Sequence, residues 1–415
     1  MKKILSFLKE YKWIFTGSFL RLWSGVLASQ VASLLFYFSL IWWSIEVLGS
    51  PLHGGILIGA GTLVTVLAAP LTGWMADRFH RGRLIVLSDI FTMIGFLFMS
   101  LFAFIEIGSI WPMYVVRILI SIVNAPVNPA FRSLLPEVVD DKNLEKAVAF
   151  QGSIMQGNQV IIPIVAGGLT VIIPYPLIWT ICASLTGFSA IWEMFIRDQR
   201  GSQSDIAFKT KQLSRGFKRL FKNQPLRLLA ISSGLDQFVF SGFPIYIAVW
   251  SLVVLQGQTL TAGSLQTFWA VGVLSTSVFM TFLANQKHIK RGVTFFSVIL
   301  GLSFLSVVLF ENFWYSCMIL LIAGGSSGII NVYLEGFLQR ASTGKDKGRT
   351  LSAFMAINSA LVPLGYAVAG WLSELVNPVW LIAMLAAPAP ITIWTVRKAI
   401  TIWEQEQQFQ KAVNE

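Results

Sequence analysis

Residues 73–83 read Gly73-Trp-Met-Ala-Asp77-Arg78-Phe-His-Arg81-Gly-Arg83. This short basic segment stands between two apolar stretches, roughly 53–75 and 84–105. A transmembrane helix needs about 20 mostly apolar residues, so each stretch is long enough to cross a bilayer. Arginines in short loops between such helices mark the cytoplasmic side of the membrane. The segment therefore predicts two membrane-spanning helices joined by a cytoplasmic loop.

The composition of the 415-residue chain agrees with a membrane protein. Hydrophobic residues make up 55% of it and charged residues 12%, about half of the roughly 25% that is usual in soluble proteins. This excludes a soluble globular enzyme, and equally a disordered or fibrous chain. Cys182 and Cys317 lie alone in apolar stretches, and the three histidines are isolated, so we expect neither a disulfide framework nor a metal site. No small-residue cleavage site closes the amino-terminal stretch, and we expect no removable signal peptide.

Outward from the basic segment, twelve apolar stretches are long enough to span a membrane. They run roughly over 19–47, 53–75, 84–105, 110–131, 147–172, 174–196, 226–255, 261–284, 292–310, 313–338, 349–374 and 378–400. The one long polar interval divides them into two groups of six. We therefore expect a six-helix amino-terminal half at 1–196, a cytoplasmic linker at 197–225, and a six-helix carboxy-terminal half with a cytoplasmic tail at 226–415.

The basic residues test this map. Of 31 Lys and Arg, 29 fall on the two ends, on every second interval or on the span edges that border these segments, all of which the positive-inside rule assigns to the cytoplasm. The other two, Arg21 and Arg117, fall inside predicted spans. Both termini are therefore expected to be cytoplasmic, and the net charge of +11 is mainly a topology signal. The alternative, a basic surface that binds nucleic acid, is the weaker interpretation.

The quoted segment resembles the loop signature of the major facilitator superfamily, Gly-x-Leu-Ala-Asp-Arg followed by basic residues. Further matches make the chain similar to the macrolide-efflux branch of drug:proton antiporters, a group that also includes siderophore exporters and, more distantly, lysophospholipid transporters. These matches are Phe19-x-x-Leu-Trp-x-Gly-x-x-x-Ser29, Leu48-Gly-Ser-Pro51, Arg117, and Pro129-Ala-Phe-Arg-Ser-Leu-Leu-Pro-Glu137. The resemblance implies an all-α integral membrane fold, with twelve transmembrane helices in two pseudo-symmetric six-helix bundles. It also implies a substrate site between the two halves near the midplane.

Among the ionisable residues inside predicted spans, the plausible functional cases are five, namely Arg21, Asp89, Arg117, Asp236 and Glu335. Such residues are costly in a membrane and are functional candidates by default. Four of the five fall on the first, fourth, seventh and tenth spans, which the resemblance implies line a central cavity. Asp236 lies about 15 Å from the inner end of its helix, near the midplane. An interfacial anchor remains the alternative for Arg21, and an ion pair with the loop arginines remains the alternative for Asp89.

These residues and their polar neighbours give the candidate sites. We expect proton coupling from Asp236, with Glu335 as a second carboxyl, and the resemblance implies the same process for Arg117. The substrate-binding candidates share helix faces with these groups. The alternative role of each candidate is interhelical hydrogen bonding or packing. The candidates are Gln30, Tyr37, Ser121, Asn124, Phe240, Phe243, Tyr246 and Asn331. The conformational loop motif is expected to comprise Gly73, Asp77, Arg78, Arg81, Arg83 and Asp89.

The sequence predicts a secondary active transporter and no enzyme, because it holds no HExxH motif and no nucleotide-binding loop. We expect a proton-coupled exporter of amphipathic small molecules such as macrolide-type drugs, in the cytoplasmic membrane of a bacterium. Its partners would be the substrate, protons and the lipid bilayer, with no cofactor, no metal and no nucleic acid, and the chain is expected to act as a monomer. A lipid or lysophospholipid translocator, a siderophore exporter and a nutrient symporter remain alternatives within transport. A membrane receptor and an embedded enzyme remain alternatives outside it.

Overall fold

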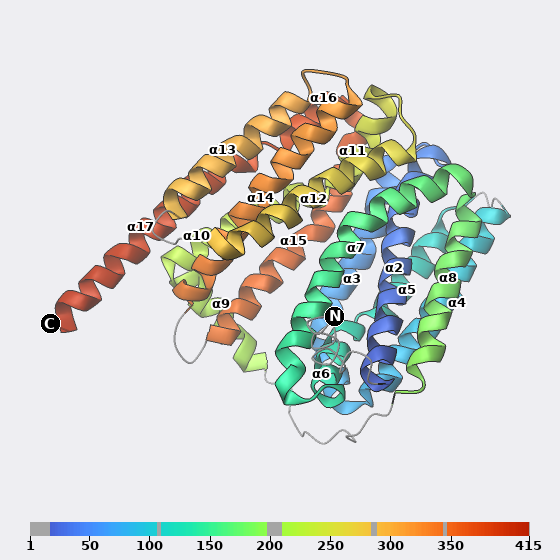
Figure 1. Cartoon of the computed structure of the whole chain (residues 1–415), viewed down its shortest axis with the longest axis horizontal. Coiled ribbons are helices and arrows are strands. Elements are labelled where there is room, and N and C mark those ends of the chain that lie inside the picture. The colour runs from blue at the N-terminus through green and yellow to red at the C-terminus, as the bar shows by residue number, and fades with distance from the viewer. Residues whose placement is uncertain (1–16, 106–108, 197–209, 284–288, 343–346, 415) are drawn as a thin grey trace, which may run out of the picture. The chain divides into compact units, whose positions relative to one another are not determined.

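The computed structural model describes residues 17–105, 109–196, 210–283, 289–342 and 347–414, and these are helical almost throughout (Figure 1). The chain divides into two compact units. The first unit comprises Met1–Leu40 and Ala60–Phe208, and the second comprises Ile41–Gly59 and Lys209–Glu415. We describe each unit by itself.

The helices up to residue 196 come first. They are α2 (Gly17–Glu46), α3 (Pro51–Arg78), α4 (Arg81–Phe104), α5 (Trp111–Asn124), α6 (Val127–Val138), α7 (Leu144–Ile172) and α8 (Tyr175–Glu193). The remaining helices are α9 (Thr210–Lys222), α10 (Gln224–Ser241), α11 (Phe243–Val249), α12 (Thr259–Leu283), α13 (Ile289–Val307), α14 (Phe313–Ala341), α15 (Lys347–Leu375), α16 (Pro378–Met384) and α17 (Pro388–Asn414).

Eleven helical stretches within the described residues are long and apolar enough to cross a membrane. They correspond to eleven of the twelve predicted spans. The twelfth predicted span, 261–284, is the helix α12. The interval predicted as a linker contains the basic helix α9.

Proline and glycine divide several spans into two helices. The predicted fourth span, 110–131, becomes α5 and α6, which meet at Ala125 and Pro126, and α6 continues to Val138. The predicted seventh span is interrupted at Gly242, just before Pro244 at the start of α11. A proline lacks an amide donor and fits the first turn of a helix, so each of these prolines begins a new helix more readily than it continues the old one.

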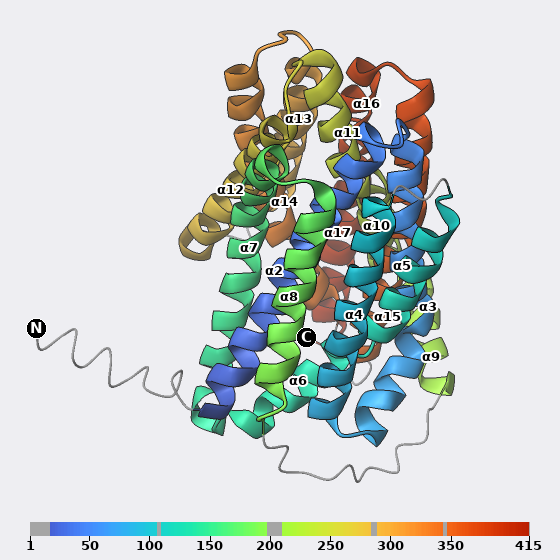
Figure 2. The ribbon, with the colours of Figure 1, turned by 90° about the vertical axis from the view of Figure 1, so that its right-hand side faces the viewer.

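The core of the first unit lies where α2, α4 and α8 run side by side (Figure 2). The ring of Phe36 lies 4.4 Å from that of Phe96 and 5.5 Å from that of Trp179, measured between centroids. The indole Nε1 of Trp179 donates to the Ser39 hydroxyl at 2.9 Å. Aromatic packing and one satisfied indole therefore fix these three helices against one another. Cys182 on α8 is fully buried in the same region.

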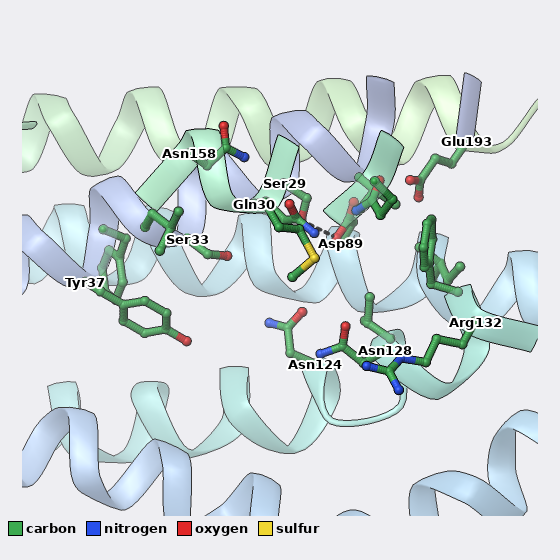
Figure 3. A pocket seen from close by; sticks show the side chains of 18 of the residues that line it. Ser29, Gln30, Ser33, Tyr37, Asp89, Asn124, Asn128, Arg132, Asn158 and Glu193 are labelled. Atoms are coloured by element: carbon green, nitrogen blue, oxygen red, sulfur yellow. Dashed lines mark hydrogen bonds between the residues drawn. The ribbon is translucent and has the colours of Figure 1, made fainter. Parts of the chain in front are cut away.

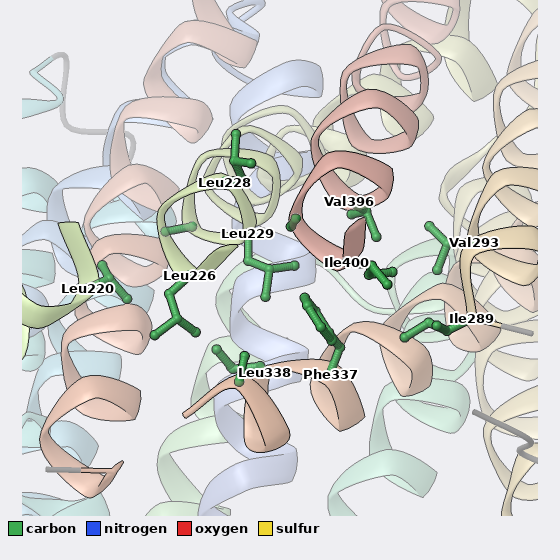
Figure 4. Close-up of a cluster of buried hydrophobic side chains, with 13 residues drawn as sticks. Leu220, Leu226, Leu228, Leu229, Ile289, Val293, Phe337, Leu338, Val396 and Ile400 are labelled. Atoms are coloured by element: carbon green, nitrogen blue, oxygen red, sulfur yellow. The ribbon is translucent and has the colours of Figure 1, made fainter. Parts of the chain in front are cut away.

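The second unit has a separate apolar core that α9, α10, α13, α14 and α17 build together (Figure 4). Leu220 brings α9 into this cluster, so the helix is anchored by its apolar side. Helices α12 and α14 approach each other closely, because a Cβ atom added at Gly324 would lie 3.1 Å from the Cα atom of Trp269. Cys317 on α14 is fully buried.

Candidate functional site

The first unit encloses a cavity of about 710 Å³, which we call the first-unit cavity. Its walls are mostly apolar, with polar side chains from α2, α4, α5, α6, α7 and α8 (Figure 3). Cavities of about 300–1,000 Å³ with apolar walls and a few polar groups are typical of sites for drug-sized molecules. The lining includes the predicted residues Gln30, Tyr37, Asp89, Arg117 and Asn124.

One end of this cavity holds a buried cation. Arg117 is 3% exposed, and its guanidinium carbon lies 4.9 Å from the centroid of the Tyr37 ring. Its Nη1 donates to the Ser121 hydroxyl at 2.5 Å, while its Nε has no hydrogen-bond partner within the described protein. Gly61 of α3 leaves the space that the guanidinium fills, because a Cβ atom there would overlap it. The aromatic face and the hydroxyl stabilise the charge in place of a carboxylate.

Two buried carboxyl groups lie farther along the cavity. Asp89 is 1% exposed, and its Oδ1 accepts a 2.9 Å hydrogen bond from the Ser29 hydroxyl. Glu193, at the end of α8, is 2% exposed and packs against Gly25, where an added Cβ atom would lie 2.6 Å from its Oε1. Asp89 Oδ2 and both Glu193 oxygens have no hydrogen-bond partner within the described protein.

Helix α2 orders these groups along the cavity. Gly25 packs against Glu193, the Ser29 hydroxyl donates to Asp89, and the Tyr37 ring lies next to the Arg117 guanidinium. At 1.5 Å per residue, the two carboxyl contacts on α2 are about 6 Å apart, and Tyr37 is about 12 Å beyond Ser29. Figure 3 shows the same order, with Tyr37 at one end and Glu193 toward the other. The cavity therefore has an acidic end and a basic end.

The second unit encloses its own cavity of about 550 Å³, which we call the second-unit cavity. Asp236 of α10 lines it, and its carboxyl oxygens accept from the Thr392 hydroxyl of α17 at 3.2 and 3.3 Å. That hydroxyl in turn accepts from Ser232 at 3.0 Å. Asp236 is thus held by hydroxyl groups, and among the described residues no cation forms an ion pair with it.

The second-unit cavity combines aromatic and polar walls. Phe240 and Phe243 stack around Trp269, with ring centroids 5.8 and 5.0 Å from it. Asn331 and Glu335 of α14 line the same cavity as Asp236, and both are exposed. Two predicted carboxyl groups and three predicted substrate-binding side chains therefore meet in one cavity of this unit.

The sequence of this chain matches a known protein family. A family model described as the Major Facilitator Superfamily matches residues 22–341. The chain belongs to the major facilitator superfamily. It is a multi-pass membrane transporter and not an enzyme, as predicted, and its family implies a small-molecule substrate.

Three proteins show which kinds of transporter this one resembles in sequence. It is 24% identical over 379 residues to the MFS-type transporter y4rN of Sinorhizobium fredii, covering 88% of this chain and 92% of the relative. It is 22% identical to macrolide efflux protein A of Streptococcus pyogenes, covering 65% and 68%. It is 23% identical to the lysophospholipid transporter LplT of Photorhabdus laumondii, covering 67% and 69%. The predicted resemblance to the macrolide-efflux branch is therefore confirmed as distant similarity.

Solved structures support the fold. A bacterial homologue of the iron transporter ferroportin, in an inward-facing state, matches the transporter with a TM-score of 0.70. The match covers 92% of this chain and 98% of that chain at 15% identity, so it bears on the fold alone. The predicted all-α membrane fold of the major facilitator type is confirmed.

Three of the residues predicted within the spans lie outside the linings of these two cavities. Ser121 is buried beside Arg117 as its hydrogen-bond partner, and Tyr246 is buried within α11. Arg21 donates to the Phe195 carbonyl oxygen at 2.9 Å and lies 6.0 Å from the centroid of the Phe195 ring. Its contacts agree with the alternative of an anchor near the helix end.

The loop residues of the transporter have different surroundings. Arg81 forms an ion pair with Glu137 and donates to the Ser133 carbonyl oxygen at 3.2 Å, so it ties the start of α4 to α6. Arg78 and Arg83 are exposed. Gly73 and Asp77 belong to the last turns of α3, and the surroundings of their side chains lie outside the described part of the structure. Asp89, which we grouped with the loop motif, instead lines the first-unit cavity and bonds Ser29.

Sequence reasoning missed Glu193. It lies three residues before the end of the predicted span 174–196, where an acidic residue is normally expected at the membrane interface. The one available signal was its place inside that span, because ionisable residues within spans deserve the same scrutiny wherever they fall. The transporter shows no group of three or more metal-ligating side chains in the residues described.

Proposed function

We propose that this transporter is a proton-coupled exporter of amphipathic small molecules, working by alternating access. It would act in the cytoplasmic membrane of a bacterium with both termini on the cytoplasmic side. The observation that carries the proposal is Asp236, a carboxyl group in the middle of a spanning helix that faces a cavity and, among the described residues, is bonded by one hydroxyl group and by no cation. A carboxyl group in such a place can bind a proton from one side of the membrane and release it to the other.

The surroundings of Asp236 support this role. Thr392 gives it one hydroxyl donor, and that donor is shared between both carboxyl oxygens. An ion pair would hold the carboxylate charged throughout the cycle, whereas a single neutral donor leaves protonation possible. Glu335 lines the same cavity and is the second proton-binding candidate. Arg117 would bias the cycle electrostatically or bind an anionic part of the substrate.

Similarity and cavity chemistry support export of amphipathic compounds. One relative is named as a macrolide efflux protein, and the two cavities combine apolar and aromatic walls with few charges. Such walls bind apolar bodies, and the isolated polar groups orient them. We place the candidate substrate contacts at Gln30, Tyr37, Asn124, Phe240, Phe243 and Asn331.

The test is transport into everted membrane vesicles with an imposed pH gradient. A panel of macrolides, lipophilic dyes, siderophores and lysophospholipids is added, and the internal pH is followed. The wild-type protein should dissipate the gradient with one of these classes, and Asp236→Asn should abolish that response. Asp141→Asn is the matched control, because Asp141 is exposed at the short turn before α7. Full gradient-driven transport by Asp236→Asn would remove the proposed role of this residue.

A second candidate is translocation of lysophospholipids. The similarity to a lysophospholipid transporter favours it, at an identity close to that of the macrolide relative. The same panel separates the two candidates. A response to lysophospholipids alone, without any response to macrolides or dyes, would favour the second candidate over drug export.

A further inference from the structure

We propose that Asp89 and Glu193 form a binding site for lipophilic organic monocations, such as amines or quaternary onium compounds, in the first-unit cavity. The physiological meaning of this site rests on the proposed export function, which it deepens by naming a substrate class. Binding itself does not depend on that function, because the proposed proton site lies in the other unit.

The first argument is that the buried carboxyl groups of Asp89 and Glu193 lack a cationic partner among the described residues. Three of the four carboxyl oxygens of Asp89 and Glu193 are buried without a hydrogen-bond partner within the described protein, and both side chains line the cavity. Buried carboxyl groups are normally satisfied by hydrogen bonds or by a cation. Oδ1 of Asp89 accepts from the hydroxyl of Ser29, and the hydroxyl of Ser189 lies beside both carboxyl groups, so their described neighbours are neutral hydroxyls. A cation in the cavity would supply the partner that the protein lacks.

The second argument is the separation of charges. Arg117 also lines the cavity, and a cationic ligand would be repelled by it. Its contact on α2, Tyr37, is about 12 Å from Ser29 and about 18 Å from Gly25 along the helix. Arg132 of α6 lies on the same side of the cavity as Glu193 (Figure 3), but its side chain is exposed, and among the described residues it forms no ion pair with Asp89 or Glu193. The acidic end is therefore the place in this cavity where a positive charge is stabilised.

The third argument concerns the kind of cation. A divalent metal ion needs about four to eight ligand atoms, mostly charged or carbonyl oxygens, nitrogens or sulfurs. Here two carboxyl groups stand among mostly apolar walls, and the described residues hold no cluster of three metal-ligating side chains. The cavity of about 710 Å³ has room for a drug-sized body next to the carboxyl groups. Val127, Phe131 and Met155 in the lining provide apolar contacts for such a body.

The experiment measures equilibrium binding of radiolabelled tetraphenylphosphonium to the purified full-length protein in nanodiscs. The wild-type protein should bind it saturably. Unlabelled tetraphenylphosphonium should displace the label, whereas tetraphenylborate, an anion of similar size and shape, should not. Glu193→Gln and Asp89→Asn should each weaken binding by roughly 30-fold or more, because each removes a buried partner of the bound charge. Glu145→Gln, the same change at an exposed position on α7, should leave the affinity unchanged.

Thermal unfolding of the same samples separates loss of the site from loss of the fold. Glu193→Gln replaces a buried acid that lacks partners by a neutral amide, so it should unfold at the same or a higher temperature than the wild type. Glu193→Asp keeps the charge and should retain saturable binding. Absence of binding by the wild type, equal displacement by the anion, or unchanged affinity in the Glu193→Gln and Asp89→Asn double variant would each overturn the proposal.

The proposed cation site and the proposed proton role of Asp236 can each be refuted without refuting the other. Loss of cation binding in the Glu193 and Asp89 variants, together with unchanged pH-driven transport in Asp236→Asn, would leave the cation site standing and remove the proton role of Asp236. Unchanged cation binding in the double variant, together with loss of transport in Asp236→Asn, would do the opposite.

Discussion

The contact between Gly61 and Arg117 predicts that Gly61→Ala destabilises the wild-type protein but does not destabilise a variant that lacks the Arg117 side chain. A methyl group at Gly61 would overlap the Arg117 guanidinium and lie 2.6 Å from the Ser121 hydroxyl oxygen. Overpacking of a buried site costs about 1–3 kcal/mol. If the guanidinium moves away instead, it loses its position over Tyr37, worth about 0.5–2 kcal/mol, and weakens a charged hydrogen bond worth about 1.5–3 kcal/mol. Gly61→Ala should therefore destabilise the wild-type protein by about 1–3 kcal/mol.

The same substitution should behave differently once the guanidinium is gone. In an Arg117→Ala background only the Ser121 hydroxyl remains close to the methyl group, and it can rotate away, while alanine favours a helix over glycine by about 0.8–1 kcal/mol. Gly61→Ala should then be neutral or stabilising. The assay is a double-mutant cycle on the free energy of unfolding, measured by denaturant titration in mixed micelles. Equal destabilisation by Gly61→Ala in both backgrounds would refute the arrangement of Gly61 around Arg117.

Three further substitutions, one of them with a matched control, test the packing of each unit by thermal unfolding of the purified protein. Gly324→Val should destabilise by about 1–3 kcal/mol, because its side chain would meet the α12 backbone, whereas Gly348→Val should be tolerated since no atom lies within 4 Å. Arg81→Gln should cost about 1–3 kcal/mol, because it removes the ionic partner of the buried Glu137 carboxyl; a loss below the error of the measurement would contradict this. Trp179→Phe should cost about 1 kcal/mol through its lost indole hydrogen bond, and no loss would show that this bond contributes nothing.

Much of the fold could be predicted because span length and loop charge are local properties of a membrane sequence. The i, i+4 spacing of Arg117 and Ser121 likewise predicts a shared helix face, and the structure joins the two by a hydrogen bond. The break of the seventh span at Gly242 was less accessible, since a Gly-Phe-Pro sequence within an apolar run is compatible with a kinked single helix.

The acidic end of the first-unit cavity could not be predicted in the same way. Whether Glu193 faces water or the protein interior depends on Gly25, which is 168 positions earlier in the chain and leaves room for its side chain. Asp89 was recognised as an intramembrane acid, but its partner could not be derived, because the basic loop beside it offered equally plausible partners. Pairwise burial of this kind is a tertiary property, and local pattern carries no signal for it.

The two cysteines have a practical consequence for labelling. Cys182 and Cys317 are both fully buried and unpaired, and each belongs to a different unit. Thiol reagents react with accessible thiolates, so a maleimide should leave both native cysteines unmodified in the folded protein. A cysteine introduced at an exposed position, such as Asp141 or Glu145, would then be the site that carries a fluorophore or spin label. The natural sequence is thereby a ready background for spectroscopic reporters, with no native thiol to be removed first.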